Sequence, residues 1–253
     1  MPMVSVIMPA YNASKTIEAA IISVLNQSFK DFELIVVNDC SVDDTEAVVR
    51  RLAQSDNRIR IFNNEKNSGV AYSRNLGVEK AFGEWIAFLD SDDMWRKDKL
   101  EKQLELAITN PEASLTYTAS GFMSSDGTEH NYVMPVQDKI NHNELLRKNL
   151  LSCSSVMVKR DLIKDYKMPS DNMSEDYAVW LMILKDIDYA YGINEPLLIY
   201  RLSENSKSSN RVKAFKMHYN SYRYVGYNGV VSFLLTAMYV FYSVSKRKKI
   251  KEV

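Results

Sequence analysis

A predicted buried strand runs straight into a cluster of acids in the segment Trp85-Ile86-Ala87-Phe88-Leu89-Asp90-Ser91-Asp92-Asp93. The five apolar residues are typical of a strand inside a sheet. Three carboxylates within the next four residues concentrate negative charge at one sheet edge, where a cation or a proton must neutralise it. The segment predicts a metal-dependent nucleotide site. An ordinary polar turn is the alternative, because Asp and Ser are good turn residues.

Short apolar runs alternate with amphipathic helical patterns over residues 4–90, as in βα units around a mostly parallel sheet. Three crossings from strand to helix predict a doubly wound half-domain, whose ligands bind beyond the carboxyl ends of the strands. We expect strands at 4–8, 32–38, 58–63 and 85–89, and helices at 14–25, 43–53 and 69–81.

Polar residues follow each of these predicted strands. They lie in the loops at 9–12, 38–39, 67–69 and 90–93. We expect the four loops to meet at one crevice that contains an aromatic ring, several amides and four acids.

The alternation weakens beyond residue 96, where the elements lengthen. A helix is predicted at 174–184, and its Ser-Glu-Asp start is typical of an acidic first turn. Asp126-Gly127 is a hairpin turn signal. We further expect a helix at 97–108, strands at 114–123 and 154–159, and an extended segment at 192–201.

The overall composition excludes several classes of protein. With 32 basic and 32 acidic residues in 253, the net charge is zero, so no global field attracts nucleic acid. Cys40 and Cys153 lie far apart and have no neighbours at metal-ligand spacing, which argues against a disulfide framework or a zinc site. The first residues show no secretory signal pattern, and we expect a reducing, cytoplasmic compartment.

The C-terminal segment differs in kind from the rest. Residues 230–244 carry no charge and are followed by Lys246-Arg247-Lys248-Lys249 and Lys251. As a helix, this apolar run covers roughly 22 Å, short of the roughly 30 Å of a bilayer core. We therefore expect a helix at the membrane surface, with its basic cluster near anionic headgroups. A core helix with a frayed basic tail, or an oligomer contact, is the alternative.

Six blocks of the sequence, in order, resemble the family 2 glycosyltransferases of the GT-A fold. The resemblance covers roughly residues 3–210 and implies an α/β protein with a Rossmann-like nucleotide-binding half, a mixed sheet and C-terminal amphiphilic helices. It divides the chain into a nucleotide-sugar half (1–95), an acceptor half (96–210) and a helical segment (211–253). The blocks are 4–12, 36–45, 67–75, 88–93, 174–180 and 200–206.

The resemblance assigns a set of residues to the nucleotide sugar. Tyr11 offers a ring face to uracil, and Asp39 accepts the imide hydrogen. The alternatives are a packing aromatic for Tyr11, an Asx turn or helix cap for Asp39, and a salt bridge within the sheet for Arg74. The assigned residues are Pro9, Tyr11, Asn12, Asp39, Asn67, Arg74, Asp90, Ser91 and Arg201.

The acids at 90–93 match the D-x-D pair of this family. The resemblance implies that Asp92 holds Mn²⁺ or Mg²⁺ and that Asp90 contacts the ribose. It also implies that Asp93 supports the mouth of the same metal site. Both cations prefer oxygen ligands and commonly bind through one or two carboxylates plus substrate phosphates.

Asp176 is the catalytic base that the resemblance implies, with Glu175 as the supporting acid and Trp180 beside the acceptor sugar. Without the family, an acidic first turn explains Glu175-Asp176 and a core tryptophan explains Trp180. Arg201 with Asn205, Ser206 and Lys207 resembles a loop that closes on the diphosphate.

These residues predict an inverting hexosyltransferase, with glucose or galactose favoured. It would move the sugar from a UDP-sugar to a lipid-linked saccharide acceptor, such as a polyprenyl diphosphate sugar, in O-antigen or capsule synthesis. We expect it at the cytoplasmic face of a bacterial inner membrane, with no nucleic acid partner. A nucleotidyltransferase of similar fold and a non-catalytic sugar-binding or scaffold relative are the alternatives.

Overall fold

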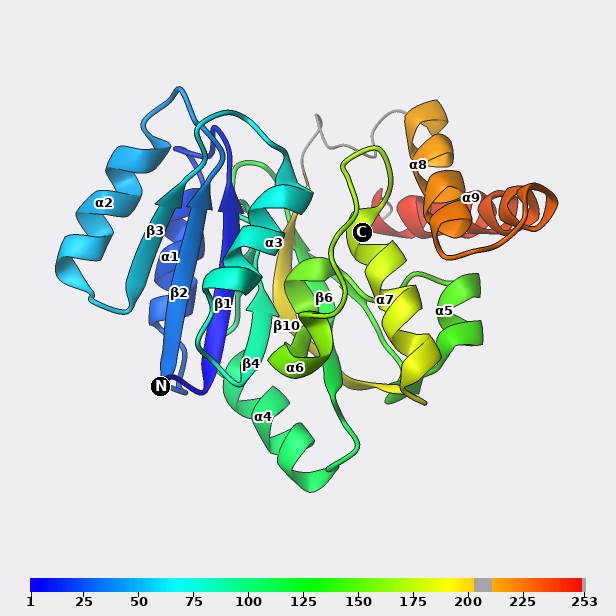
Figure 1. The fold of residues 1–253 in the computed structure, drawn as a ribbon, viewed down its shortest axis with the longest axis horizontal. Coiled ribbons are helices and arrows are strands. Elements are labelled where there is room, and N and C mark those ends of the chain that lie inside the picture. Colours follow the sequence, from blue (N-terminus) through cyan, green and yellow to red (C-terminus); the bar gives the residue numbers. More distant parts are fainter. Residues whose placement is uncertain (203–210, 252–253) are drawn as a thin grey trace.

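The computed structural model describes residues 1–202 and 211–251 of the chain, which form an α/β structure around one sheet (Figure 1). The strands of that sheet are β1 (Val4–Ala10), β2 (Phe32–Asn38), β3 (Ile59–Asn63), β4 (Trp85–Phe88), β5 (Met94–Trp95), β6 (Leu115–Met123), β7 (Glu129–Met134), β8 (Lys139–Ile140), β9 (Met157–Lys159) and β10 (Ala190–Arg201). The helices are α1 (Ile17–Leu25), α2 (Thr45–Ser55), α3 (Val70–Lys80), α4 (Lys99–Thr109), α5 (His142–Arg147), α6 (Arg160–Ile163), α7 (Glu175–Asp186), α8 (Arg211–Tyr224) and α9 (Gly229–Lys251), with a 3₁₀ turn η1 (Cys153–Ser155).

The N-terminal half of the sheet is parallel. Its strands lie in the order β3-β2-β1-β4, and β1 pairs in parallel with both β2 and β4. Each residue of β1 and β2 is buried, as expected for strands covered on both faces. The predicted succession of strands and helices over residues 4–90 is therefore confirmed.

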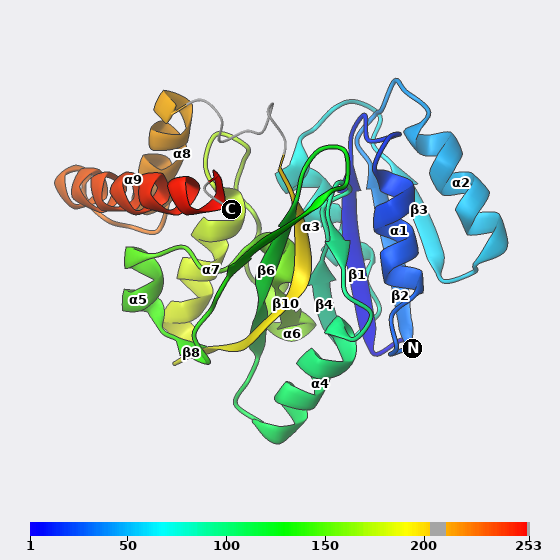
Figure 2. The same cartoon turned by 180° about the vertical axis from the view of Figure 1, so that it is seen from behind.

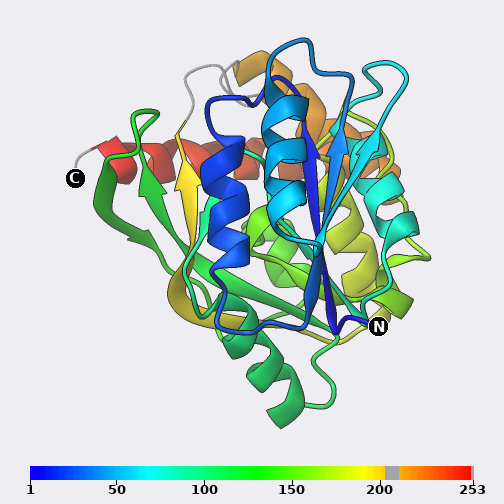
Figure 3. The same cartoon turned by 90° about the vertical axis from the view of Figure 1, so that its left-hand side faces the viewer.

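Alternate residues of these strands feed two cores. Val6 and Met8 pack in one core with α1, α2 and α4, whereas Ile7 packs in the other with α3 and α7. Figure 3 shows α1 and α3 on opposite sides of the sheet, seen nearly along its edge. This two-sided cover leaves the ends of the strands as the place where polar side chains can gather.

The second half makes the sheet mixed. The order continues β4-β9-β6-β10-β5, in which β9 is antiparallel to β4 and to β6, and β10 is parallel to β6. The predicted turn at Asp126-Gly127 connects β6 to β7, and Gly127 has a φ of 90°, which favours glycine. The sequence prediction missed four short elements, because they are too short to show a hydrophobic periodicity. They are β5, β8, α5 and α6.

The two C-terminal helices lie beside α7 in both views (Figure 1 and Figure 2). The predicted apolar helix at 230–244 forms the first two thirds of α9. Within residues 1–202 and 211–251, no helix combines the length and the apolar character that crossing a bilayer requires.

Candidate active site

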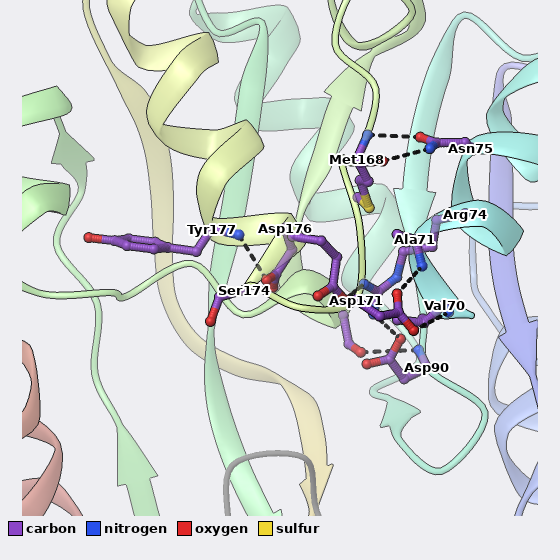
Figure 4. A network of polar contacts seen from close by, with 12 residues as sticks. Val70, Ala71, Arg74, Asn75, Asp90, Met168, Asp171, Ser174, Asp176 and Tyr177 are labelled. Carbon is purple, nitrogen blue, oxygen red and sulfur yellow. Dashed lines mark hydrogen bonds and ion pairs between the residues drawn. The ribbon is translucent and has the colours of Figure 1, made fainter. Parts of the chain in front are cut away.

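A buried arginine joins the acids of β4 to those of α7. One guanidinium nitrogen of Arg74, Nη2, donates to Asp90 Oδ1 at 2.6 Å, and Nη1 donates to Glu175 Oε1 at 2.8 Å (Figure 4). Burial alone would lower the pKa of Arg74, but the carboxylates of Asp90 and Glu175 raise it well above its ordinary value. Arg74 therefore stays charged and holds the two acidic segments together.

The Arg74 side chain is buried, and its contacts are with acids of the protein itself. Its side chain is 5% exposed and forms ion pairs. These pairs join α3 to the segment after β4 and to α7, whereas the alternative left by the sequence was a salt bridge within the sheet. The predicted contact with the base or a phosphate of the donor remains a prediction.

The acids that follow β4 carry mutually repelling charges. Burial and the neighbouring charge of Asp90 raise the pKa of Asp92 to about 6. Burial also raises the pKa of Asp93 well above its ordinary value, and the charges of Asp92 and Asp90 add to the shift. Such an arrangement attracts a cation.

Arg201, at the end of β10, is fixed against these acids. Its backbone N–H donates to Asp93 Oδ1 at 2.9 Å, and its Nε donates to the carbonyl oxygen of Asp92 at 2.8 Å. Its Nη1 donates to the carbonyl oxygens of Ser124 and Ser125 in the β6–β7 turn. Arg201 thus lies at the acidic mouth, and its predicted contact with the diphosphate is untested. The predicted loop residues Asn205, Ser206 and Lys207 lie outside the described residues.

The acidic mouth has the chemistry of a hard-cation site that is completed by substrate. Asp93 Oδ2 is buried and has no hydrogen-bond partner among the described residues. Within residues 1–202 and 211–251, no three His, Cys, Asp or Glu side chains form a metal cage by themselves. Mg²⁺ and Mn²⁺ are often held by one or two carboxylates together with substrate phosphates. The residues present fit that mode, with Asp92 as the candidate ligand and Asp93 beside it.

Asp176 occupies the first turn of α7. Its Oδ1 accepts the backbone N–H of Tyr177 at 2.8 Å (Figure 4). Burial and the charge of Glu175 raise the pKa of Asp176 to about 6, although Arg74 opposes this shift. A carboxylate with a pKa near 6 is a better proton acceptor at neutral pH than an ordinary aspartate.

Two carboxylates hold four successive N–H groups at the start of α3. Asp39 accepts from Ser68 and Gly69, each at 2.8 Å. Asp171 accepts from Val70 at 3.1 Å and from Ala71 at 3.0 Å (Figure 4). These bonds satisfy backbone donors that the first turn of a helix leaves unpaired. Asp171 also joins the loop before α7 to the start of α3.

Gly69 is required at the centre of this arrangement. Its φ is 89°, and a Cβ at this position would lie 2.4 Å from Asp171 Oδ2. Glycine is favoured here for two reasons: the backbone is left-handed, and the Asp171 carboxylate leaves no room for a Cβ.

The remaining predicted donor residues lie around the same strand ends. Tyr11 is 49% exposed directly after β1, and Asn12 adopts a φ of 49° with its Oδ1 accepting the N–H of Val42. Pro9 is a buried residue of β1, whereas Asn67 is exposed in the loop before α3. Ser91 is half-buried between Asp90 and Asp92. The strand ends bring these residues together, but their contacts with a donor stay predictions.

Trp180 is a core residue in this structure, and the acceptor role predicted for it stays untested. Its side chain is 0% exposed and packs on Phe88 of β4, with ring centroids 5.9 Å apart. Trp180 lies one turn beyond Asp176 on α7, but the apolar face of that helix points into the core. This position matches the core tryptophan that the sequence left as an alternative.

Asp171 and Ser154 are the site residues that the sequence prediction missed. Ser154, in η1, accepts the N–H of Asp90 at its Oγ, 3.1 Å away, and so fixes the start of the acidic segment. Both residues lie in irregular segments remote in sequence from their partners, and no local pattern identifies them.

Comparisons with known proteins identify the family of this chain. The family model described as "Glycosyl transferase family 2" matches residues 5–167. A putative teichuronic acid biosynthesis glycosyltransferase, TuaG of Bacillus subtilis (strain 168), is 41% identical over 222 residues, which cover 88% of each chain. The Escherichia coli protein WfgD, a UDP-Glc:alpha-D-GlcNAc-diphosphoundecaprenol beta-1,3-glucosyltransferase, is 39% identical over 86% of this chain and 84% of its own.

The same architecture occurs in a solved structure. The S. aureus protein TarS (residues 1–349), in complex with UDP-GlcNAc, superimposes with a TM-score of 0.74, covering 95% of this chain and 72% of that one. At 20% sequence identity, this likeness shows the fold, which is the predicted GT-A fold. The match of the family model and the identity to full-length relatives show that this chain belongs to glycosyl transferase family 2.

Proposed function

We propose that the chain is an inverting, metal-dependent hexosyltransferase that uses a UDP-sugar and a lipid-linked saccharide acceptor. The observation that carries the proposal is the linkage from Asp176 through Glu175 and Arg74 to Asp90. It supports the proposal because it connects the carboxylate of raised pKa at the start of α7 with an acid that follows β4. Glucose is the favoured donor sugar, because the relative WfgD is named for transfer from UDP-Glc to a GlcNAc-diphosphoundecaprenol. Galactose is the next candidate.

In the proposed reaction, the Asp176 carboxylate takes the proton of an acceptor hydroxyl. The hydroxyl oxygen then forms a bond to the anomeric carbon as the bond from that carbon to the UDP oxygen breaks. Because the oxygen attacks from the face opposite the leaving group, one displacement inverts the centre, and an α-linked donor gives a β-linked product. UDP departs with the electron pair of the broken bond.

A bound divalent cation would supply charge neutralisation for the departing diphosphate. Asp92 is the residue that would hold it, with Asp93 beside it. The raised pKa of Asp92 indicates a carboxylate that gains from a nearby positive charge.

Donor recognition is proposed for Tyr11 and Asp39. The exposed Tyr11 ring offers a stacking face for uracil. Asp39 Oδ2 accepts one hydrogen bond, from Gly69, and a carboxylate oxygen can accept a second. The imide N–H of uracil is a donor at the atom where cytosine has none, which would favour uridine.

The lipid carrier of the proposed acceptor sets the place of the reaction at a membrane surface. We propose the cytoplasmic face of a bacterial inner membrane and a role in surface polysaccharide synthesis. Cys40 and Cys153 are both free thiols, which is consistent with a reducing compartment.

A donor screen tests this function. The protein is incubated with Mn²⁺, a GlcNAc-diphosphate lipid and each of several UDP-sugars, and UDP release and product linkage are measured. We expect transfer from UDP-glucose or UDP-galactose with β-configuration in the product. An α-linked product would contradict inversion. In a parallel incubation with UTP and a sugar 1-phosphate, release of diphosphate would identify a nucleotidyltransferase. UDP binding without transfer from any donor would identify a non-catalytic relative.

A further inference from the structure

The C-terminal helix α9 turns its apolar side toward solvent. Its exposed side chains recur at the spacing of one helix face, and they are between 47% and 79% exposed. They are Val230, Phe233, Leu234, Met238 and Phe241. We call this set the apolar face of α9.

Two hydroxyl residues of the same helix face the protein. Ser232 and Thr236 are each 0% exposed. Both hydroxyls bond to nearby backbone: Thr236 Oγ1 donates to the Ser232 carbonyl oxygen at 2.6 Å, and Ser232 Oγ donates to the Tyr227 carbonyl oxygen at 3.4 Å. A soluble surface helix normally has the opposite arrangement, so the apolar face calls for a partner.

A groove between α8 and α9 extends this apolar face. It is an open surface groove of about 530 Å³, lined by Phe215, Lys216, Tyr219, Gly229, Val230 and Phe233. The rings of Phe215 and Phe233 meet edge to face, 5.7 Å apart. The groove is therefore apolar, with a lysine at its side.

The charge of this segment identifies the kind of surface it fits. The whole chain has 32 basic and 32 acidic residues, yet residues 211–251 contain nine Lys and Arg and neither Asp nor Glu. An anionic lipid surface attracts each such cation by about 1 kcal/mol. The combination of exposed aliphatic and aromatic residues with only positive charge matches an anionic bilayer.

We propose that the apolar face of α9, together with the groove beside α8, docks onto the surface of a bilayer that contains anionic lipids. The docking is interfacial, in keeping with the absence of a spanning helix among the described residues. The apolar side chains enter the boundary between headgroups and acyl chains, and the basic residues meet the lipid phosphates.

Contacts from α8 and α9 reach the start of α7, two residues before the candidate base. Ser221 of α8 accepts the N–H of Ser174 at 3.1 Å, and His218 packs between Tyr177 and Tyr239, with ring centroids 5.6 Å and 3.6 Å away. The docking face is therefore built onto the first turn of α7, where Asp176 lies. Docking would bring the membrane close to the candidate base. The inference deepens the proposed function and rests on it only in assuming a lipid-linked acceptor.

The test is vesicle flotation of the full-length protein. We compare the wild type with a variant carrying Phe233→Gln, Leu234→Gln and Phe241→Gln, and with a control carrying Ile108→Gln, Val133→Gln and Tyr189→Gln, three hydrophobics exposed elsewhere. Vesicles of phosphatidylcholine with phosphatidylglycerol should bind the wild type and the control. The α9 variant should lose at least tenfold in the bound fraction. Circular dichroism confirms that each variant is folded.

A second measurement needs no variant. Wild-type binding should fall at least fivefold in pure phosphatidylcholine vesicles and at high salt, because the cations contribute. Equal binding by the wild type and the α9 variant would overturn the proposal. So would a wild type that binds no vesicles but is a dimer that the α9 substitutions convert to a monomer.

These outcomes are separate from those of the proposed function. Transfer to a short-chain, water-soluble acceptor should be the same in the wild type and the α9 variant. Vesicle binding without transfer would reject the proposed function and leave the docking face intact.

Discussion

Arg74 Nη2 lies 2.6 Å from Asp90 Oδ1, and this buried contact connects the acidic end of β4 to the interior of the site. The second arm of the guanidinium reaches Glu175 at the start of α7. Two segments separated by about a third of the chain are therefore held in register by one side chain.

Arg74→Met should destabilise the fold by about 3–5 kcal/mol, because it leaves the buried Glu175 carboxylate without its cation. Urea unfolding monitored by circular dichroism measures the change. The matched control, Arg96→Met, breaks an exposed pair with Glu129 and should cost less than about 1 kcal/mol. Equal losses of unfolding free energy in both variants would show that the buried Arg74 ion pairs contribute no more than an exposed pair.

Activity should fall as pH drops below about 6, the pKa of Asp176, because the base must be ionised to accept a proton. We expect log kcat/KM to rise with a slope near one up to this pH and then to level. A plateau that extends down to pH 4 would exclude Asp176 as the titrating base.

The raised pKa of Asp176, which favours catalysis near neutral pH, lowers the stability of the fold there. Since the folded pKa of Asp176 lies above its ordinary 3.8, the fold favours the neutral form, and stability is lost as pH rises from about 4 to about 6. Asp176→Asn should therefore gain on the order of 1–3 kcal/mol at pH 8 relative to the wild type, and no such gain should remain at pH 3. Thermal unfolding at both pH values measures this, and a loss of stability at pH 8 would contradict it.

Asp171→Ala should cost about 1 kcal/mol, because two N–H groups at the start of α3 lose their acceptor. Asp165→Ala, in an exposed position of the same connection, is the control and should be neutral. Gly69→Ala should cost more than Asp171→Ala, since the new Cβ meets a carboxylate in a left-handed backbone. Chemical denaturation ranks the three variants, and the reverse order would reject this account of the loop.

Tyr11→Ala should weaken UDP binding by about 1–3 kcal/mol, which is the typical contribution of a ring stacked on a base. Tyr11→Phe should bind nearly as the wild type does, because stacking needs the ring face and not the hydroxyl. Isothermal titration calorimetry gives the affinities, with Tyr189→Ala as an exposed-tyrosine control. Unchanged binding in Tyr11→Ala would place the base elsewhere.

Local sequence patterns predicted the parallel half of the fold well. Strands such as 32–38 are continuously apolar, and their helices carry a clear period, so each element is identified by its own residues. The acids at 90–93 were located in the same way, because they end such a strand.

Residues whose position depends on distant partners were harder to predict. Trp180 shares a helix face with Asp176 by spacing alone, but the tertiary fold buries that face against Phe88. Asp171 looks like an unremarkable loop acid until the fold places it at the start of α3. The orientation of α9 was also hidden, because a run of apolar residues does not say which side meets the protein.

The central claim is that Asp176 deprotonates the acceptor at a site that binds the donor independently. The most direct test is product formation by Asp176→Asn, with UDP-glucose, Mn²⁺ and a GlcNAc-diphosphate lipid, beside UDP affinity measured on the same preparation. We predict that transfer falls at least a thousandfold while UDP affinity stays within about threefold of the wild type. Transfer at the wild-type rate by a folded Asp176→Asn would contradict the account.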